Sequence, residues 1–185
     1  VPGAEQMPFQ KYLYPVLGNK ILQIGSSNSI GNFSPQDSIS LFTSSNKKSI
    51  IAPIICYESI YGEYVGAFVK KGAQAIFIIT NDGWWKETSG YKQHSMYARL
   101  RAIETRRYIA RSANTGISSI INPLGEIEQY IEWDKKDVIK SNIFLNNHLT
   151  FYVRHGDYLG RVSFFLSLLM LLYFFIINKL HISLK

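Results

Sequence analysis

The chain has 185 residues, enough for one domain with an appendage and a substantial core. Its formal net charge of +7 invites a nucleic-acid or anionic-membrane partner, but the basic residues are scattered without an arm or dense run, so nucleic-acid binding is the least favoured class. The single cysteine, Cys56, excludes an internal disulfide, and zinc-type ligand spacing is absent. We therefore expect no metal or other cofactor.

The first residues form loops. The start, Val1-Pro2-Gly3-Ala4-Glu5, lacks the basic and apolar regions of a signal peptide, and we expect the sequence to begin inside a larger protein. Prolines and glycines interrupt residues 1–20, where Glu5 is a lone carboxylate that ordinary statistics place on the surface. Serine- and asparagine-rich residues 26–48 then lead into an edge strand at Ile39 to Phe42.

An isoleucine-rich run over residues 50–55 predicts a buried strand that ends at Cys56, Tyr57 and Glu58. Helical spacing from Ser59 to Lys71 predicts a helix that Gly72 stops, with an apolar side formed by four residues: Ile60, Tyr64, Ala67 and Phe68. A thiol between a strand and a helix start lies near free N–H groups and the positive dipole end, and both favour the nucleophilic thiolate. The alternative is a small buried hydrophobe, as most free cysteines are.

A second buried strand is expected at Ala75 to Thr80, which makes a strand–helix–strand unit with parallel neighbours. It ends in a turn that begins at Asn81, and Trp84 and Trp85 follow. Adjacent tryptophans cannot both point into one core from a turn. At least one should line a cleft or face an apolar partner, although both could simply cap the core.

The longest predicted helix covers residues 92–113. Its apolar stripe contains Met96, Leu100 and Ile103, and five arginines fill much of the remainder as a solvated face: Arg99, Arg101, Arg106, Arg107 and Arg111. Strands are expected at residues 117–121, at 126–131 as an antiparallel return, and near 138–144.

The C-terminal part is apolar from Val162 to Ile177 apart from two serines. This length is at the short end for a membrane span, which needs about 20 residues, and Asn178 to Leu180 can extend it by snorkelling. Because apolar residues occupy every side, a span is favoured over a buried core helix. The basic residues on the two sides are nearly balanced and do not orient the span.

Four motifs in this order resemble the carbon–nitrogen hydrolase (nitrilase) superfamily. They are Ile55-Cys56-Tyr57-Glu58, Thr80-Asn81-Asp82-Gly83-Trp84-Trp85, Arg101-Ala102-Ile103-Glu104 and Ala113-Asn114-Thr115-Gly116-Ile117-Ser118. Residues 150–157 and the following apolar helix resemble a membrane-bound branch that acylates bacterial lipoproteins. The resemblance implies an α/β fold, a nitrilase-like αββα sandwich that is only partial here. The expected domains are residues 1–157, a transmembrane helix at 158–180 and a short tail at 181–185.

The resemblance also implies a mechanism. Cys56 would take an acyl chain from a phospholipid as a thioester and pass it to the N-terminal amine of a diacylglyceryl lipoprotein. Glu5, Glu58 and Tyr57 would support the site, and three residues would contact the substrate or lipid: Asn81, Trp84 and Trp85. The enzyme would lie in the bacterial inner membrane, with its catalytic domain periplasmic and its C-terminus cytoplasmic.

Two further classes remain open: an amidase of the same superfamily that hydrolyses a C–N bond, and a non-catalytic membrane-tethered module. In the family a glutamate base and a lysine complete the site. The resemblance places both of them before Val1, so we expect the 185 residues alone to be inactive.

Overall fold

The computed structural model describes residues 38–45 and 48–183. Within these residues six strands form one sheet in the order β1-β2-β3-β4-β5-β6. The strands are β1 (Phe42–Thr43), β2 (Ile50–Ile55), β3 (Ala75–Thr80), β4 (Ile109–Ala113), β5 (Ser118–Ile121) and β6 (Ile127–Ile131). The helices are η2 (Cys56–Ile60), α2 (Gly62–Lys70), η3 (Asp82–Trp85), α3 (Ser89–Thr105), α4 (Phe151–His155) and α5 (Tyr158–Ser183), where η denotes a 3-10 helix. All of them belong to one of two units into which the chain divides, Ser40–Lys185.

The sheet is mixed. β2, β3 and β4 run parallel, whereas β1 pairs antiparallel with β2, and β5 and β6 continue antiparallel from β4. The predicted parallel strand–helix–strand unit and the return strand after residue 125 are therefore confirmed. Because β2 and β3 are parallel neighbours, Cys56 and Asp82 follow the carboxyl ends of adjacent strands, at one edge of the sheet.

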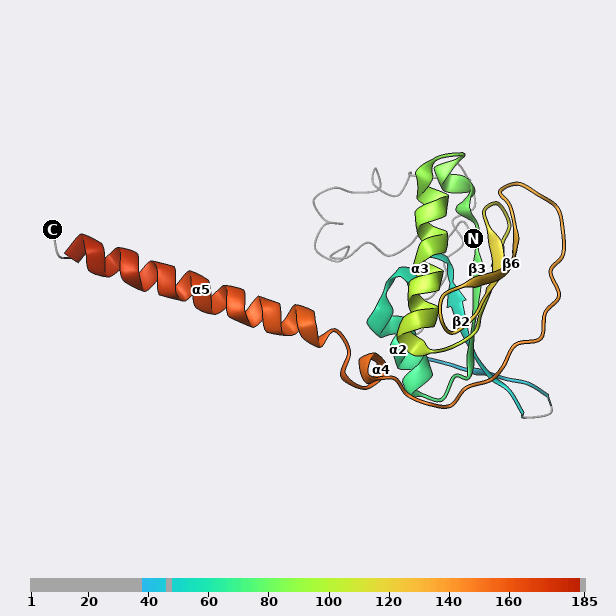
Figure 1. Cartoon of the computed structure of the whole chain (residues 1–185), viewed down its shortest axis with the longest axis horizontal. Helices are drawn as coiled ribbons and strands as arrows, with labels where there is room; N and C mark the ends of the chain where they lie inside the picture. Colours follow the sequence, from blue (N-terminus) through green and yellow to red (C-terminus); the bar gives the residue numbers. More distant parts are fainter. Residues whose placement is uncertain (1–37, 46–47, 184–185) are drawn as a thin grey trace, which may run out of the picture. The chain divides into compact units, whose positions relative to one another are not determined.

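One face of this sheet is covered by helices and the other is exposed. The covered face carries buried apolar side chains from three strands, and α2 contacts β2 while α3 contacts β4 (Figure 1); these side chains are Ala52, Ile54, Ile76, Ile78 and Ile109. On the opposite face Ile55, Phe77 and Ile79 are 41–57% exposed. An αββα sandwich buries such a face against a second sheet, and the described residues contain one sheet. The arrangement corresponds to half of the expected sandwich.

The predicted helix after Cys56 is divided in two. Cys56 opens the five-residue η2, and α2 begins only at Gly62. The buried side of α2 consists of Val65, Gly66, Phe68 and Val69, so the predicted stripe was wrong except at Phe68. As predicted, the helix stops at Gly72, whose φ of +109° suits glycine and whose N–H donates to the Val69 carbonyl.

The predicted helix over residues 92–113 was wrong at both ends and on its faces. It begins at Ser89 and ends at Thr105, because Arg106 takes the left-handed conformation and the chain then enters β4. The predicted apolar stripe lies outside, with Met96, Leu100 and Ile103 each more than 40% exposed. Small and polar residues face inward instead: Tyr91, His94, Ser95, Ala98, Arg101, Ala102 and Thr105.

Three of the arginines assigned to a solvated face are buried, because each has oxygen partners inside. Arg101 pairs with Glu104, Arg107 donates to the Ala73 and His148 carbonyls, and Arg111 pairs with Asp82. The strand predicted near residues 138–144 was also wrong, since that segment contains neither helix nor strand. It crosses the surface without a strand partner.

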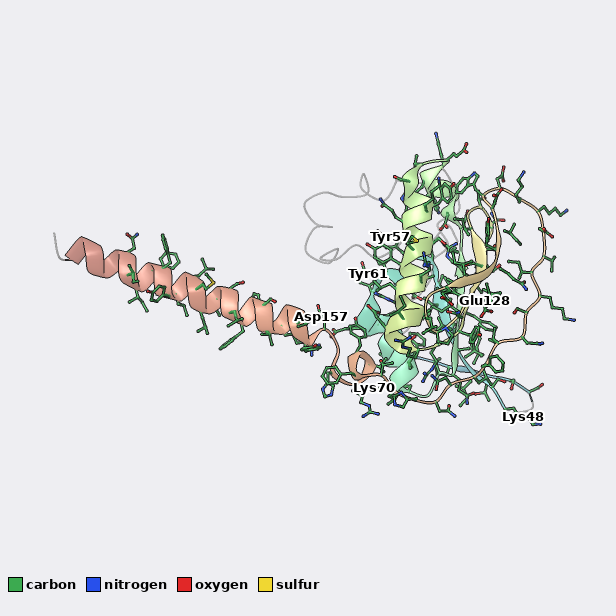
Figure 2. All side chains as sticks on the ribbon, viewed as in Figure 1. Lys48, Tyr57, Tyr61, Lys70, Glu128 and Asp157 are labelled. Carbon is green, nitrogen blue, oxygen red and sulfur yellow. The ribbon has the colours of Figure 1, made fainter. Side chains whose placement is uncertain are left out.

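The C-terminal helix α5 is long and apolar enough, by length and composition, to cross a membrane over Tyr158–Asn178, and none of that window is buried. Side chains project above and below the helix in Figure 2, in agreement with the exposure of its residues from Val162 to Ile177. At its beginning Arg161 forms an ion pair with Glu63 of α2, and the Asp157 N–H donates to the same carboxylate at 2.8 Å.

Candidate active site

Cys56 occupies a sharp corner between β2 and η2. Its φ is +52°, in the left-handed region that a residue with a side chain rarely adopts. Its carbonyl oxygen accepts from the Ser59 hydroxyl at 2.8 Å and lies 3.2 Å from His94 Nε2. The thiol is half-buried, and it is the only one in the sequence. Strain of this kind persists only where the surroundings hold it, and it is concentrated at functional sites.

The strand-to-helix thiol of the sequence prediction is therefore present, but its surroundings differ. A single short 3-10 turn follows Cys56, and α2 starts six residues later. The helix dipole that the sequence prediction invoked is therefore much weaker at the Cys56 thiol, because the dipole grows with the number of aligned peptides. The polar partners of the corner matter more.

Glu58 supports the corner from within η2. Its carboxylate accepts from the Ile55 N–H at 2.8 Å and from the Tyr64 hydroxyl at 3.2 Å. Burial, with help from the negative charge and hydrogen bond of Glu58, raises the pKa of Tyr64 to about 12. Both oxygens of Glu58 thus have donors, and the side chain acts on the backbone that carries the thiol.

Beneath the corner lies a buried polar chain that the sequence did not reveal. His94 of α3 is 2% exposed; its Nδ1 lies 2.8 Å from Asp82 Oδ1, and its Nε2 lies 3.1 Å from Ser59 Oγ. Arg111 of β4 donates to Asp82 Oδ2 at 2.6 Å, and Thr80 donates to Asp82 Oδ1 at 3.0 Å. We call Asp82, His94 and Ser59 the histidine chain.

The partners of Asp82 determine its charge. Burial alone would raise the pKa of Asp82, but the hydrogen bond from His94 and the charge and hydrogen bond of Arg111 outweigh it and hold the pKa below the usual 3.8. Asp82 is therefore ionised at neutral pH. A buried carboxylate of this kind is tolerated because both of its oxygens have donors.

The aromatic residues predicted for the site are brought together in part. Tyr57, which is labelled in Figure 2, has its ring centroid 6.0 Å from that of Trp85 and 5.7 Å from that of His94. Trp85 also lies 5.3 Å from the His94 ring and packs against Gly90, where an added Cβ would come within 2.5 Å of it. Its neighbour Trp84 is 54% exposed. One tryptophan thus supports the corner and the other faces outward.

Two further residues were predicted for the site, Asn81 and Glu5. The Asn81 side-chain oxygen accepts from the Gly83 N–H at 3.1 Å and caps η3, so its amide oxygen serves the turn. Glu5 lies outside the described residues.

Sequence reasoning missed Ser59, His94 and Arg111. One signal was available, because Asp82 lies two residues after a buried strand, Cys56 directly follows another, and the ends of parallel neighbours meet. His94 gave none, because its helix buries a polar face. Among residues 38–45 and 48–183 no cluster of three metal-ligating side chains occurs.

The chain has relatives among known proteins. The chain is 34% identical over 163 residues to an apolipoprotein N-acyltransferase of Chlorobaculum tepidum, with 88% of this chain and 30% of that protein covered. It is 31% identical over 183 residues to an apolipoprotein N-acyltransferase of Wigglesworthia glossinidia brevipalpis, with 97% and 34% covered. The chain thus spans about a third of the length of these relatives.

The fold is similar to that of a carbon-nitrogen hydrolase from Helicobacter pylori G27, with a TM-score of 0.50 at 16% identity over 56% of this chain and 43% of that one. This likeness supports the nitrilase-type α/β fold expected from the sequence. Residues 13–147 match the family described as carbon-nitrogen hydrolase. The chain belongs to the carbon–nitrogen hydrolase family.

Proposed function

We propose that these residues form part of a membrane-bound N-acyltransferase in which Cys56 carries the acyl group. The donor is a phospholipid, and the acceptor is the N-terminal amine of a diacylglyceryl lipoprotein. The observation that carries the proposal is the only thiol of the chain, placed at a strand end in a left-handed backbone and held by polar partners. The names of the relatives supply the reaction class.

The chemistry takes two balanced steps. The Cys56 thiolate attacks the ester carbonyl of the phospholipid; a C–S bond forms, the C–O bond breaks, and the lysophospholipid alkoxide leaves with the proton that the thiol gave up. The lipoprotein amine then attacks the thioester; a C–N bond forms, the C–S bond breaks, and the amine proton returns to the thiolate. Two easier transfers replace one difficult one.

Both steps need a proton carrier and a cation for the tetrahedral oxyanion. Glu58, the carboxylate nearest in sequence to Cys56, is committed to Ile55 and Tyr64. We therefore propose that the base and the cation come from another part of a longer protein, as the resemblance implies. Turnover is then expected from the complete protein and not from these 185 residues.

The lipid donor requires a site at the bilayer surface. In this proposal α5 spans the membrane, which is the inner membrane of a bacterium, and the sheet lies on the periplasmic side with the C-terminus in the cytoplasm. Exposed Trp84 and the surplus of basic residues suit a surface of anionic headgroups, each nearby Lys or Arg adding about 1 kcal/mol.

The test is to trap the intermediate in the full-length protein that contains these residues. The protein is incubated with a phospholipid radiolabelled in its acyl chains, and the label on the protein is located by mass spectrometry. We expect a hydroxylamine-sensitive label on Cys56, its absence in Cys56→Ala, and its transfer to a diacylglyceryl peptide. Trp133→Phe, remote in sequence from the corner, serves as the control and should label normally.

Retained transfer by Cys56→Ala would refute the proposal. Release of the acyl group to water, with none on the peptide amine, would assign the site to a hydrolase of the same family. A protein that stays in the aqueous phase without detergent would remove the membrane part.

A further inference from the structure

The backbone of Cys56 is strained, and something must hold it. A φ of +52° costs free energy for any residue with a Cβ, so an unrestrained Cys56 would relax to an ordinary conformation. Relaxation would rotate the peptide plane after Cys56 and change the direction of the thiol. The groups that bind the Cys56 carbonyl therefore determine where the thiol points.

Two side chains meet that carbonyl. Ser59 Oγ donates to it at 2.8 Å, and His94 Nε2 lies 3.2 Å from it and 3.1 Å from Ser59 Oγ. Ser59 belongs to the same short turn, whereas His94 comes from α3, 38 residues away in sequence. A contact from a separate helix restrains the corner in a way that a local contact cannot.

The contact with the Cys56 carbonyl also assigns one ring proton of His94. A carbonyl oxygen only accepts, so the contact with Cys56 requires a proton on Nε2. At the other end of the ring, Nδ1 lies 2.8 Å from Asp82 Oδ1 and 3.3 Å from Arg111 Nη2. His94 is thus held between Asp82 and Arg111 at one end and donates to the corner at the other.

The ring itself cannot shift easily. Asp82 is fixed by Arg111 on its other oxygen and by its own N–H, which donates to the Thr115 carbonyl at 2.8 Å. The rings of Tyr57 and Trp85 pack against the imidazole. His94 therefore has one available orientation, and the Cys56 carbonyl lies at the end of it.

We propose that His94 is a positioning residue for Cys56: anchored by Asp82, it donates through Nε2 to the Cys56 carbonyl and keeps the thiol directed for acyl transfer. The inference rests on the proposed role of Cys56 as the acyl carrier. His94 touches neither the thiol sulfur nor a substrate in this account. It acts through the backbone.

The experiment measures single-turnover acylation of Cys56 in the full-length protein. His94→Met keeps a similar volume without a donor, and His94→Gln keeps an N–H group near the position of Nε2. We expect Met to slow acylation by about 10- to 100-fold, as misplacement of a reacting group does, and Gln to recover most of the rate. The KM for the phospholipid should change less than about threefold in both, because only positioning is lost.

The matched control is Thr105→Val. Thr105 is buried on the same helix and donates to the Arg101 carbonyl at 2.7 Å, so its loss lowers stability without touching the histidine chain. It should lower Tm and leave the acylation rate unchanged. Wild-type acylation in His94→Met, or equal slowing in Thr105→Val and His94→Met at equal Tm loss, would overturn the inference.

Should His94→Met fail to fold, His94→Asn replaces it, because the shorter side chain keeps an amide but cannot reach the Cys56 carbonyl as Nε2 does. A slowing of about threefold or more at unchanged KM supports the inference, and an unchanged rate overturns it.

If the wild type forms no thioester, the proposed function fails, and alkylation of Cys56 by iodoacetamide becomes the readout. An alkylation rate changed at least threefold by His94→Met and restored by His94→Gln then supports the positioning role, and an unchanged rate overturns it.

Discussion

Three glycines separate the effects of backbone strain and of steric contact on the fold. Gly116 has a φ of +135°, and an added Cβ would lie 2.5 Å from Asp82 Oδ2 and 2.9 Å from its Cβ. Gly72 has a φ of +109° with no heavy atom within 4 Å of that Cβ. Gly66 lies inside α2 with neither problem. Substitution by alanine therefore tests three different combinations.

The magnitudes follow from these environments. Gly66→Ala should raise the free energy of unfolding by about 0.5–1 kcal/mol through helix propensity. Gly72→Ala should lower it by about 1–2 kcal/mol through the left-handed backbone alone. Gly116→Ala adds overpacking against a buried carboxylate, and the combined loss should be about 2–5 kcal/mol. The last value is a large share of the stability of an ordinary domain.

Urea unfolding of the chain in nonionic detergent, followed by tryptophan fluorescence, measures all three. The three tryptophans, Trp84, Trp85 and Trp133, lie outside α5 and report on the sheet unit. The midpoints should rank Gly66→Ala above wild type, then Gly72→Ala, then Gly116→Ala. A Gly116→Ala midpoint equal to or above that of Gly72→Ala would show that the contact with Asp82 is not as tight as the structure places it.

Three other predictions concern buried polar groups. Because folding lowers the pKa of Asp82, the stability that this carboxylate contributes is complete well above pH 3.8 and is lost as the pH falls through the lower folded value. Asp82→Asn should therefore flatten the acid side of a plot of Tm against pH, and an unchanged slope would contradict this. Glu58→Gln should lower the pKa of Tyr64 from about 12 only part of the way to 10, since burial is the larger cause of the shift. Absorbance titration, with Tyr64→Phe as the reference that lacks this phenol, measures the pKa, and an unchanged value would disprove the contact. Arg107→Met should lower the free energy of unfolding by about 2–4 kcal/mol, because the Ala73 and His148 carbonyls lose their donor. Amide hydrogen exchange should become faster at residues 146–149, and unchanged exchange there would contradict the prediction.

Much of the fold follows from local sequence. The isoleucine run before Cys56, the run from Ala75 to Thr80 and the return strand near residue 127 appear where apolar runs and turn residues predicted them. The apolar helix at the C-terminus was equally plain. These features depend on the residues within one segment, so a sequence shows them directly.

The exact shape of the candidate site depends on contacts between segments that are far apart in the sequence. That α3 buries His94 and Arg101 while exposing Leu100 cannot be inferred from helix periodicity, because a polar side chain is buried only when other segments supply its partners. The partners of His94 are Ser59 in η2 and Asp82 in η3, the turns that follow β2 and β3.

The sequence by itself determined that a lone thiol follows a buried strand and that a second strand ends beside it. Only the tertiary structure decided the left-handed backbone of Cys56, the start of α2 at Gly62 and the histidine chain beneath the corner. The physical reason is range: strand formation reflects neighbouring residues, whereas strain and buried hydrogen bonds exist only after distant segments have been brought together.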